Sequence, residues 1–211
     1  MVMNIRKKDL EFIIEKSPSF PNPKRELEQY PTDSKVAADI LWIAYMKGDI
    51  ENLRVLDLGC GTGRLSIGAS LLNASHIISI DIDEEVIEQF INWAKKLNTY
   101  GYIDAIVADA LHPPLRDKSI DTVIMNPPFG VHRKGIDLEF LKTAMKLART
   151  IYSIHKSVPK SKELITKFAK LQGFEPYLIS EFQLKIPQLY ETHFKKVHRV
   201  KVSLFLFKER C

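Results

Sequence analysis

Cysteine is scarce in this chain, which has only Cys60 and Cys211 among its 211 residues. Two thiols are too few for a disulfide framework, and neither has a metal-ligand spacing to any of the six histidines. We therefore expect free thiols in a reducing cytoplasm and no bound metal ion.

Long apolar runs, repeats and low-complexity tracts are also missing. No stretch reaches the roughly 18 consecutive apolar residues that a membrane-spanning helix requires, and the start, Asn4–Asp9, lacks the apolar region of a signal peptide. No linker separates two domains. We expect one globular unit away from the membrane, in which residues 1–48 form a helical N-terminal extension of a domain formed by residues 49–211.

Apolar runs of strand length alternate with helical patterns over most of the chain. The expected strands are 54–58, 76–81, 103–108, 120–125 and 150–155, and the expected helices are 5–16, 34–46, 64–72, 83–97, 137–149 and 161–171. Ser34 or Thr32 is the expected cap of the second helix, and Asp33 adds favourable charge there. Two strand-like runs, 177–186 and 197–207, follow without a helix between them. This order predicts an α/β fold with a seven-stranded, mostly parallel sheet, helices on both faces and an antiparallel C-terminal hairpin.

A glycine-rich loop follows the first predicted strand. Arg54–Leu58 runs into Gly59-Cys-Gly-Thr-Gly63, and a helical pattern begins at Arg64. Glycine lets the backbone approach a ligand closely, and the start of a helix offers free N–H groups to a carboxylate. The same spacing also occurs in dinucleotide-binding loops, so the loop alone does not identify its ligand.

Acidic residues at the ends of the next two strands narrow the choice of ligand for this loop. Asp81 ends one strand, where its carboxylate can accept hydrogen bonds from both hydroxyls of a ribose. Asp109 follows the next, where it can accept from an adenine amino group. The carboxyl ends of parallel strands meet at one edge of a sheet. Successive sites for a carboxylate, a ribose and an adenine there predict S-adenosylmethionine rather than NAD.

The stretch Asn126-Pro127-Pro128-Phe129 directly follows the predicted strand 120–125. Proline fixes φ and removes the N–H donor, so the two prolines make a stiff edge of hydrogen-bond acceptors. The carboxamide oxygen of Asn126 and the carbonyl of Pro127 can accept both hydrogens of a planar amine, and a flat ring can stack on Phe129. We predict that these four residues form the catalytic site for methylating an aromatic or amide nitrogen.

The chemistry of such an acceptor sets what the site must do. An adenine amino nitrogen is a poor nucleophile, because its lone pair is delocalised into the ring. Hydrogen bonds to Asn126 and Pro127 that strengthen as positive charge develops favour attack. The proton can leave after methyl transfer, so we predict no catalytic histidine. The base must be exposed to reach the site, which predicts an unpaired or flipped-out nucleotide.

These motifs resemble the amino-methylating branch of the class I S-adenosylmethionine-dependent methyltransferases, whose fold is Rossmann-like. More narrowly, the chain resembles the methyltransferase-like 5 family, whose members methylate N6 of an adenosine in small-subunit ribosomal RNA. The similarity runs from about Leu27 to the last strand. It is carried by Leu27–Thr32, Leu65–Gly68, Asp121–Gly130, Phe140–Ala144 and Tyr152–Lys156.

The resemblance implies specific cofactor contacts, and implies that the extension 1–48 completes the cofactor site. The implied cofactor-binding residues are Gln29, Thr32, Asp57, Gly59, Gly61, Thr62, Arg64, Asp81, Asp109 and Ala110. Thr62-Gly-Arg64 departs from the Cys-Gly-Val of animal members, which leaves the role of the Arg64 side chain open. The resemblance also implies a small zinc-binding activator protein that docks at the strand Ile103–Val107, at the edge of the sheet.

Basic residues concentrate at the C-terminal end. Residues 185–211 contain seven Lys or Arg and two Glu, which accounts for the whole formal charge of +5. Interleaved aromatic residues, Tyr190 and Phe194, make a mixture that suits a strand of RNA. A second basic group follows Phe129. The predicted RNA contacts are His132, Arg133, Lys134, Lys156, Lys195, Lys196 and Arg199. His155 is expected to face the cleft in which these residues would bind RNA.

Three alternatives to an RNA adenine methyltransferase remain. Protein glutamine N5-methyltransferases use a similar Asn-Pro-Pro loop, typically followed by Tyr, and a side-chain amide has the same NH₂ geometry. Phe129, the basic C-terminal region and the lack of a peptide-recognition domain favour RNA. DNA adenine methylation is disfavoured because no domain is present to read a duplex. A non-catalytic subunit that only scaffolds a partner would be identified by failure to bind the cofactor.

Overall fold

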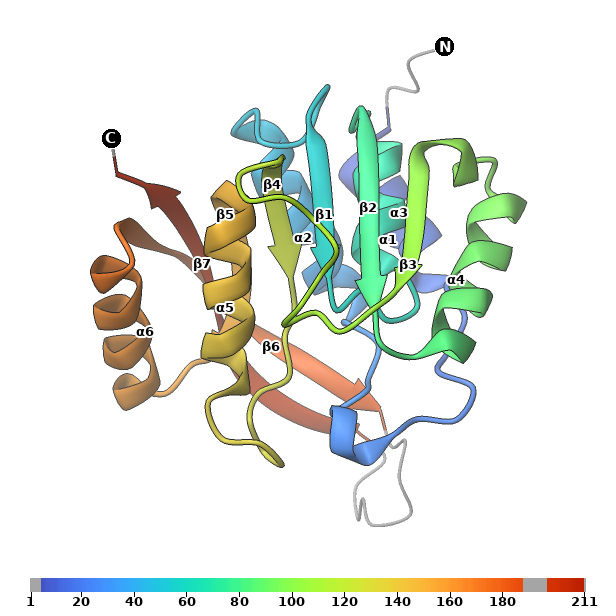
Figure 1. Cartoon of the computed structure of the whole chain (residues 1–211). Helices are drawn as coiled ribbons and strands as arrows, with labels where there is room; N and C mark the ends of the chain where they lie inside the picture. The colour runs from blue at the N-terminus through green and yellow to red at the C-terminus, as the bar shows by residue number, and fades with distance from the viewer. Residues whose placement is uncertain (1–4, 188–196, 211) are drawn as a thin grey trace.

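The computed structural model of the protein describes residues 5–187 and 197–210. One seven-stranded sheet runs through this part of the chain (Figure 1). Its strands are β1 (Arg54–Leu58), β2 (His76–Asp81), β3 (Ile103–Val107), β4 (Ile120–Met125), β5 (Ala148–Lys156), β6 (Phe174–Pro187) and β7 (Val197–Glu209). The helices are α1 (Lys7–Glu15), α2 (Ser34–Met46), α3 (Arg64–Leu71), α4 (Glu84–Lys96), α5 (Ile136–Leu147) and α6 (Pro159–Leu171), with 3₁₀ turns η1 (Arg25–Leu27) and η2 (Tyr100–Tyr102).

The strand order is β3-β2-β1-β4-β5-β7-β6. Strands β1 to β5 pair in parallel, whereas β7 runs antiparallel to both β5 and β6. The predicted α/β fold with an antiparallel C-terminal hairpin is therefore confirmed, as is the edge position of β3. The order reverses between β1 and β4, and a ligand site in such sheets lies at the carboxyl ends of the strands beside that reversal.

Helices cover both faces of the sheet (Figure 1). Buried side chains of α1 to α4 pack on one face, and those of α5 and α6 pack on the other. Successive residues of a strand point to opposite faces, so Val55 joins the first cluster while its neighbour Leu56 joins the second. No helix among the described residues is long and apolar enough to cross a bilayer.

The predicted elements are all present, and their ends differ from the prediction by at most two residues, except that β6 begins three residues earlier. The predicted cap of α2 is wrong. Asp33 is the N-cap, and its Oδ1 accepts a hydrogen bond from the Val36 N–H at 3.2 Å. Thr32 lies one residue before this N-cap, and its hydroxyl accepts from Asn126 Nδ2, at 3.0 Å, in the acceptor loop (residues 126–135) that follows β4.

Between α1 and α2 the chain forms a crossing segment, residues 17–33, which lies over the carboxyl ends of the strands. Arg64, the first residue of α3, donates through Nε to Ser17 Oγ at 2.5 Å and through Nη1 to the Thr32 carbonyl. Both ends of the crossing segment are thereby fastened to the start of α3, next to the glycine loop.

Candidate active site

A cavity of about 270 Å³ lies where the crossing segment covers the carboxyl ends of β1, β2 and β4. All ten residues predicted to bind the cofactor line it, as do Asn126 and Pro128. The structure thus brings together, around one space, residues that are separated by as many as 99 positions in the sequence. Pro127 is buried beside the cavity without lining it, and Phe129 is half-buried.

Asp81 joins the glycine loop to the end of β2. Its Oδ2 accepts from the Gly61 N–H at 2.8 Å, and its Oδ1 accepts from the Asp83 N–H at 3.0 Å. Burial raises the pKa of the Asp81 carboxyl above its ordinary value. The backbone of the loop is held close to this carboxylate at the wall of the cavity.

Asp57, near the end of β1, has one carboxylate oxygen with no hydrogen-bond partner. Its Oδ2 accepts from the Ser66 N–H at 2.9 Å and from Ser66 Oγ at 2.6 Å, while Oδ1 accepts none from the described residues. The side chain is buried, and burial raises the pKa of Asp57 to about 7. A buried carboxylate oxygen without a partner is costly. A ligand group that carries positive charge or an N–H donor would satisfy it.

Asn126, the first residue of the acceptor loop, is fixed in one orientation. Because Nδ2 donates to Thr32 Oγ1 at 3.0 Å, Oδ1 is left as the free acceptor, and no described residue donates to it. Tyr30 of the crossing segment packs near Phe129, with ring centroids 5.8 Å apart, and Lys156 Nζ lies 5.8 Å from the centre of the Phe129 ring. The start of the acceptor loop therefore combines a buried amide acceptor with an aromatic ring and a nearby cation.

Gln29 and Arg64 use their side chains to hold the crossing segment in place. Gln29 Nε2 donates to Asp83 Oδ2 at 2.8 Å, and Gln29 Oε1 accepts from the Lys24 N–H at 2.7 Å. Arg64 makes the two contacts to the crossing segment described above, and burial lowers its pKa. The role that the sequence left open for Arg64 is thus a bridge between the glycine loop and the crossing segment.

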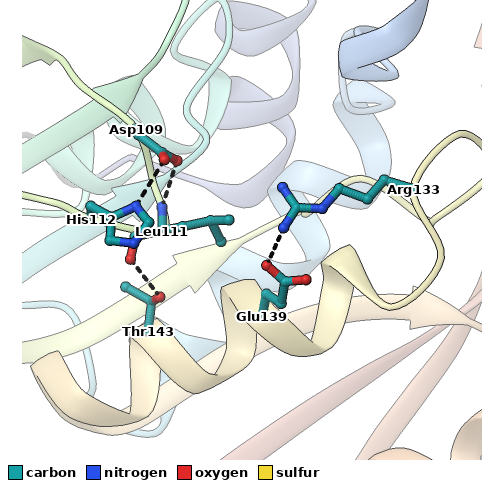
Figure 2. Close-up of polar contacts among 6 residues, drawn as sticks. All are labelled: Asp109, Leu111, His112, Arg133, Glu139 and Thr143. Atoms are coloured by element: carbon teal, nitrogen blue, oxygen red, sulfur yellow. Dashed lines mark hydrogen bonds and ion pairs between the residues drawn. The ribbon is translucent and has the colours of Figure 1, made fainter.

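The loop after β3 is tied to α5 at another end of the cavity (Figure 2). Asp109 accepts from the Leu111 N–H at 2.9 Å and from His112 Nδ1 at 3.0 Å, and Thr143 Oγ1 of α5 donates to the Leu111 carbonyl at 3.4 Å. The His112 hydrogen bond lowers the pKa of Asp109, so this carboxylate is ionised at neutral pH.

The predicted RNA contacts lie in different surroundings. Arg133 lines the cavity and donates to Glu139 Oε2 of α5 at 2.5 Å (Figure 2). His132 and Lys134 are exposed beside it, outside the cavity lining. Arg199 is exposed on β7, whereas Lys195, Lys196 and the interleaved Tyr190 and Phe194 lie outside the described residues.

His155 does not face the cleft, so that prediction is wrong. Its side chain is fully buried, with Nδ1 3.2 Å from Asp137 Oδ2 and Nε2 2.9 Å from Ser153 Oγ. The alternation of side chains along β5 turns His155 toward the face that α5 covers, against Phe205 and Phe207. Lys156, one residue later, is the one that lies near Phe129.

Glu28 contacts the acceptor loop, and the sequence did not predict this. Its carboxylate accepts from the backbone N–H groups of Phe129 at 2.8 Å, Val131 at 2.6 Å and His132 at 3.2 Å. The partners are 101 to 104 positions apart in the sequence, so no local pattern connects them. The only signal was its place beside Gln29 in a segment that already carried the resemblance.

Comparison with known proteins agrees with this geometry. The family model of the methyltransferase domain matches residues 49–195. The rRNA N6-adenosine-methyltransferase METTL5 of Danio rerio is 37% identical over 204 residues, which cover 95% of this chain and 97% of that protein. An uncharacterized protein of Methanocaldococcus jannaschii is 41% identical over 208 residues, covering 95% and 93%. Among solved structures, the proposed RNA methyltransferase PH1948 of Pyrococcus horikoshii superposes with a TM-score of 0.89 at 36% identity, covering 98% and 99%.

Proposed function

Because this chain belongs to the methyltransferase domain family and, within it, to the METTL5 family, we propose that it methylates N6 of an adenosine in RNA. The adenosine is unpaired or flipped out, and belongs to small-subunit ribosomal RNA. The observation that carries the proposal is Asn126 Oδ1, a buried amide oxygen at the cavity wall to which no described residue donates a hydrogen bond. Thr32 fixes the orientation of this amide by accepting a hydrogen bond from its nitrogen, Nδ2.

The cavity also supports S-adenosylmethionine as the methyl donor. Asp57 Oδ1 has no partner and suits the ammonium of the methionine part. The start of α3, whose N-cap residue Gly63 supplies no side-chain cap, suits its carboxylate. Asp81 would accept from the ribose and Asp109 from the adenine. The proposed cofactor-binding residues are Gln29, Thr32, Asp57, Gly59, Gly61, Thr62, Arg64, Asp81, Asp109 and Ala110, with residues 1–48 completing the site from the crossing segment.

In the proposed mechanism the protein aligns the acceptor and stabilises the charge that develops on it. When bound, S-adenosylmethionine supplies an electrophilic methyl group. Asn126 Oδ1 and the Pro127 carbonyl accept hydrogen bonds from the amine and strengthen them as the nitrogen becomes positive. Phe129 holds the base by stacking. No side chain is required to remove a proton before attack.

RNA would approach from the outer side of the acceptor loop. Lys156 lies near the Phe129 ring, where its charge can meet a phosphate beside the extruded base. The residues proposed to contact RNA are His132, Arg133, Lys134, Lys156, Lys195, Lys196 and Arg199. Arg133 differs from the others because it also lines the cavity, where it can contact either ligand.

The proposal is tested by methyl transfer from labelled S-adenosylmethionine to small-subunit ribosomal RNA, followed by nucleoside analysis. A glutamine-bearing protein acceptor is assayed in parallel. The expected product is N6-methyladenosine in the RNA. Label on the protein acceptor would instead make the chain a glutamine methyltransferase, and failure to bind the cofactor would make it a non-catalytic scaffold.

Cofactor affinity is expected to rise about 10-fold between about pH 6 and about pH 8, because Asp57 pairs with an ammonium only when ionised and its pKa is about 7. In Asp57→Asn this rise should disappear. Calorimetric titration of both proteins across the range measures it. An unchanged pH profile in the variant would assign the titration to another group, of which Asp81 is the nearest candidate.

The raised pKa of Asp57 also predicts how the stability of the folded protein depends on pH. The folded-state pKa of Asp57 lies above the value of about 3.9 in an unfolded chain, so the folded protein binds the extra proton. The stabilisation from Asp57 is complete below about pH 4 and is lost as the pH rises through about 7. Asp57→Asn should lack this loss in denaturant titrations without cofactor.

We further propose a small zinc-binding activator protein at the free edge of β3. This edge carries the exposed side chains of Tyr102 and Val107, and no described strand pairs with it beyond β2. Val107→Lys is expected to abolish co-purification of the activator, since Val107 is 48% exposed, whereas Ile106 also packs against the core. Complex formation that is unaffected by this change would rule out docking at the edge.

A further inference from the structure

Glu28 makes three hydrogen bonds to the acceptor loop. Oε2 accepts from the Phe129 N–H, and Oε1 accepts from the N–H groups of both Val131 and His132. Glu28 itself has a left-handed backbone, with φ of 52° and ψ of 39°, which is uncommon for a residue other than glycine. The chain therefore accepts an unfavourable backbone conformation at the residue whose carboxylate reaches the acceptor loop.

The acceptor loop needs such a contact because it has few others on its outer side. Val131, His132, Arg133 and Lys134 are exposed, and Gly130, with φ of 75°, sits between the stiff proline pair and these residues. Hydrogen bonds to an ionised acceptor are about twice as strong as neutral ones. One carboxylate that binds three of the loop amides is therefore the main polar restraint on residues 129–132.

The position of Glu28 in the sequence connects this restraint to the rest of the cavity. Gln29, the next residue, binds Asp83 beyond the end of β2, and Thr32, four residues on, binds Asn126. A five-residue stretch thus contacts both the proposed cofactor half and the proposed acceptor half of the site. Movement of this stretch would shift Phe129 relative to Asn126.

We propose that Glu28 is a positioning residue for methyl transfer. Its carboxylate holds the backbone of residues 129–132 so that Phe129 and the Pro127 carbonyl present the acceptor base at the Asn126 amide. This role rests on the proposed function for its effect on catalysis, and on the hydrogen bonds alone for its effect on the loop. Because the carboxylate is engaged by three amides, Glu28 does not serve as a base.

The test compares Glu28→Ala and Glu28→Gln with Glu88→Gln, which changes an exposed carboxylate on α4 that does not line the cavity. In Glu28→Ala, kcat is expected to fall about 100-fold, since misplacement of reacting groups by about 1 Å costs this much. The KM for RNA and the Kd for cofactor should change by no more than about threefold. Glutamine keeps one acceptor oxygen but places an NH₂ group against the remaining amides. The kcat of Glu28→Gln should therefore lie between those of Glu28→Ala and the wild type.

Amide hydrogen exchange provides a readout that does not depend on activity. Exchange in a peptide covering residues 127–135 should become faster in both Glu28 variants and stay unchanged in Glu88→Gln. Unchanged exchange in Glu28→Ala would overturn the proposal, and so would faster exchange with wild-type kcat. A parallel loss of cofactor affinity and kcat would also overturn it, in favour of a structural role at the cofactor. If the wild type transferred no methyl group to RNA, the proposed function would fail, while the exchange data would still decide whether Glu28 holds the loop.

Discussion

Replacing Asn126 with alanine is expected to lower the rate of methyl transfer about 100- to 1,000-fold at saturating cofactor, the size of effect seen when one preorganised electrostatic contact is removed from an active site. The variant loses Oδ1, the buried acceptor without a partner, and leaves the other cavity walls intact. Cofactor affinity should therefore stay within about twofold of the wild type. Labelled methyl transfer and calorimetric cofactor binding measure the two effects separately.

Two further variants make the Asn126 result specific. Thr32→Val keeps the shape of the side chain but removes the hydroxyl that accepts from Asn126 Nδ2 at 3.0 Å, so the amide can rotate and the rate should fall about 10-fold. Asn92→Ala removes an exposed amide on α4 and should leave the rate unchanged. Equal losses of rate and of cofactor affinity in Asn126→Ala would show that Asn126 supports the fold rather than the reaction.

Gly63→Ala is expected to destabilise the protein by about 2 to 5 kcal/mol, the sum of overpacking and a left-handed backbone. A Cβ at this position would lie 2.0 Å from Phe90 Cδ2, and Phe90 is fully buried between α4 and the glycine loop. The backbone φ of 81° adds strain for any residue other than glycine. Denaturant unfolding of the wild type and the variant gives the difference in free energy.

Gly48→Ala is the matched control, because its φ of 75° is similar and a Cβ there would meet no atom within 4 Å. It should cost only the backbone term, about 1 to 2 kcal/mol. The difference between the two variants isolates the contact with Phe90. If both variants lost the same stability, the Phe90 ring would have to move aside without cost, contrary to the packing of a buried aromatic side chain.

The local elements and the motifs at their ends could be predicted from the sequence. Strands β1, β2 and β4 have the predicted bounds, and Asp81, Asp109 and Asn126 stand where predicted strands end. Strand and helix periods depend on neighbouring residues, so they are visible in a single sequence. Glycine and proline interrupt helices and strands, and their positions in the sequence located the glycine loop and the acceptor loop.

The helix caps and the side of the sheet to which individual side chains point were harder to predict. Asp33, rather than Thr32 or Ser34, caps α2, and the Thr32 hydroxyl accepts from the distant Asn126 amide instead. His155 is turned into the core because β5 is covered by α5 on that face. In both cases the local rule permitted several outcomes, and only the folded structure shows which one is adopted.

By itself, the sequence determined the order of strands and helices, the glycine loop, and the acidic and amide residues at the carboxyl ends of the strands, because each depends on residues close together in the chain. Only the tertiary structure decided which polar atoms remain without partners and which loops are fastened. The contacts of Glu28 with the acceptor loop, of Thr32 with Asn126 and of Arg64 with Ser17 join residues 47 to 104 positions apart. Such contacts leave no local pattern, since each residue is satisfied by a group that only folding brings within reach.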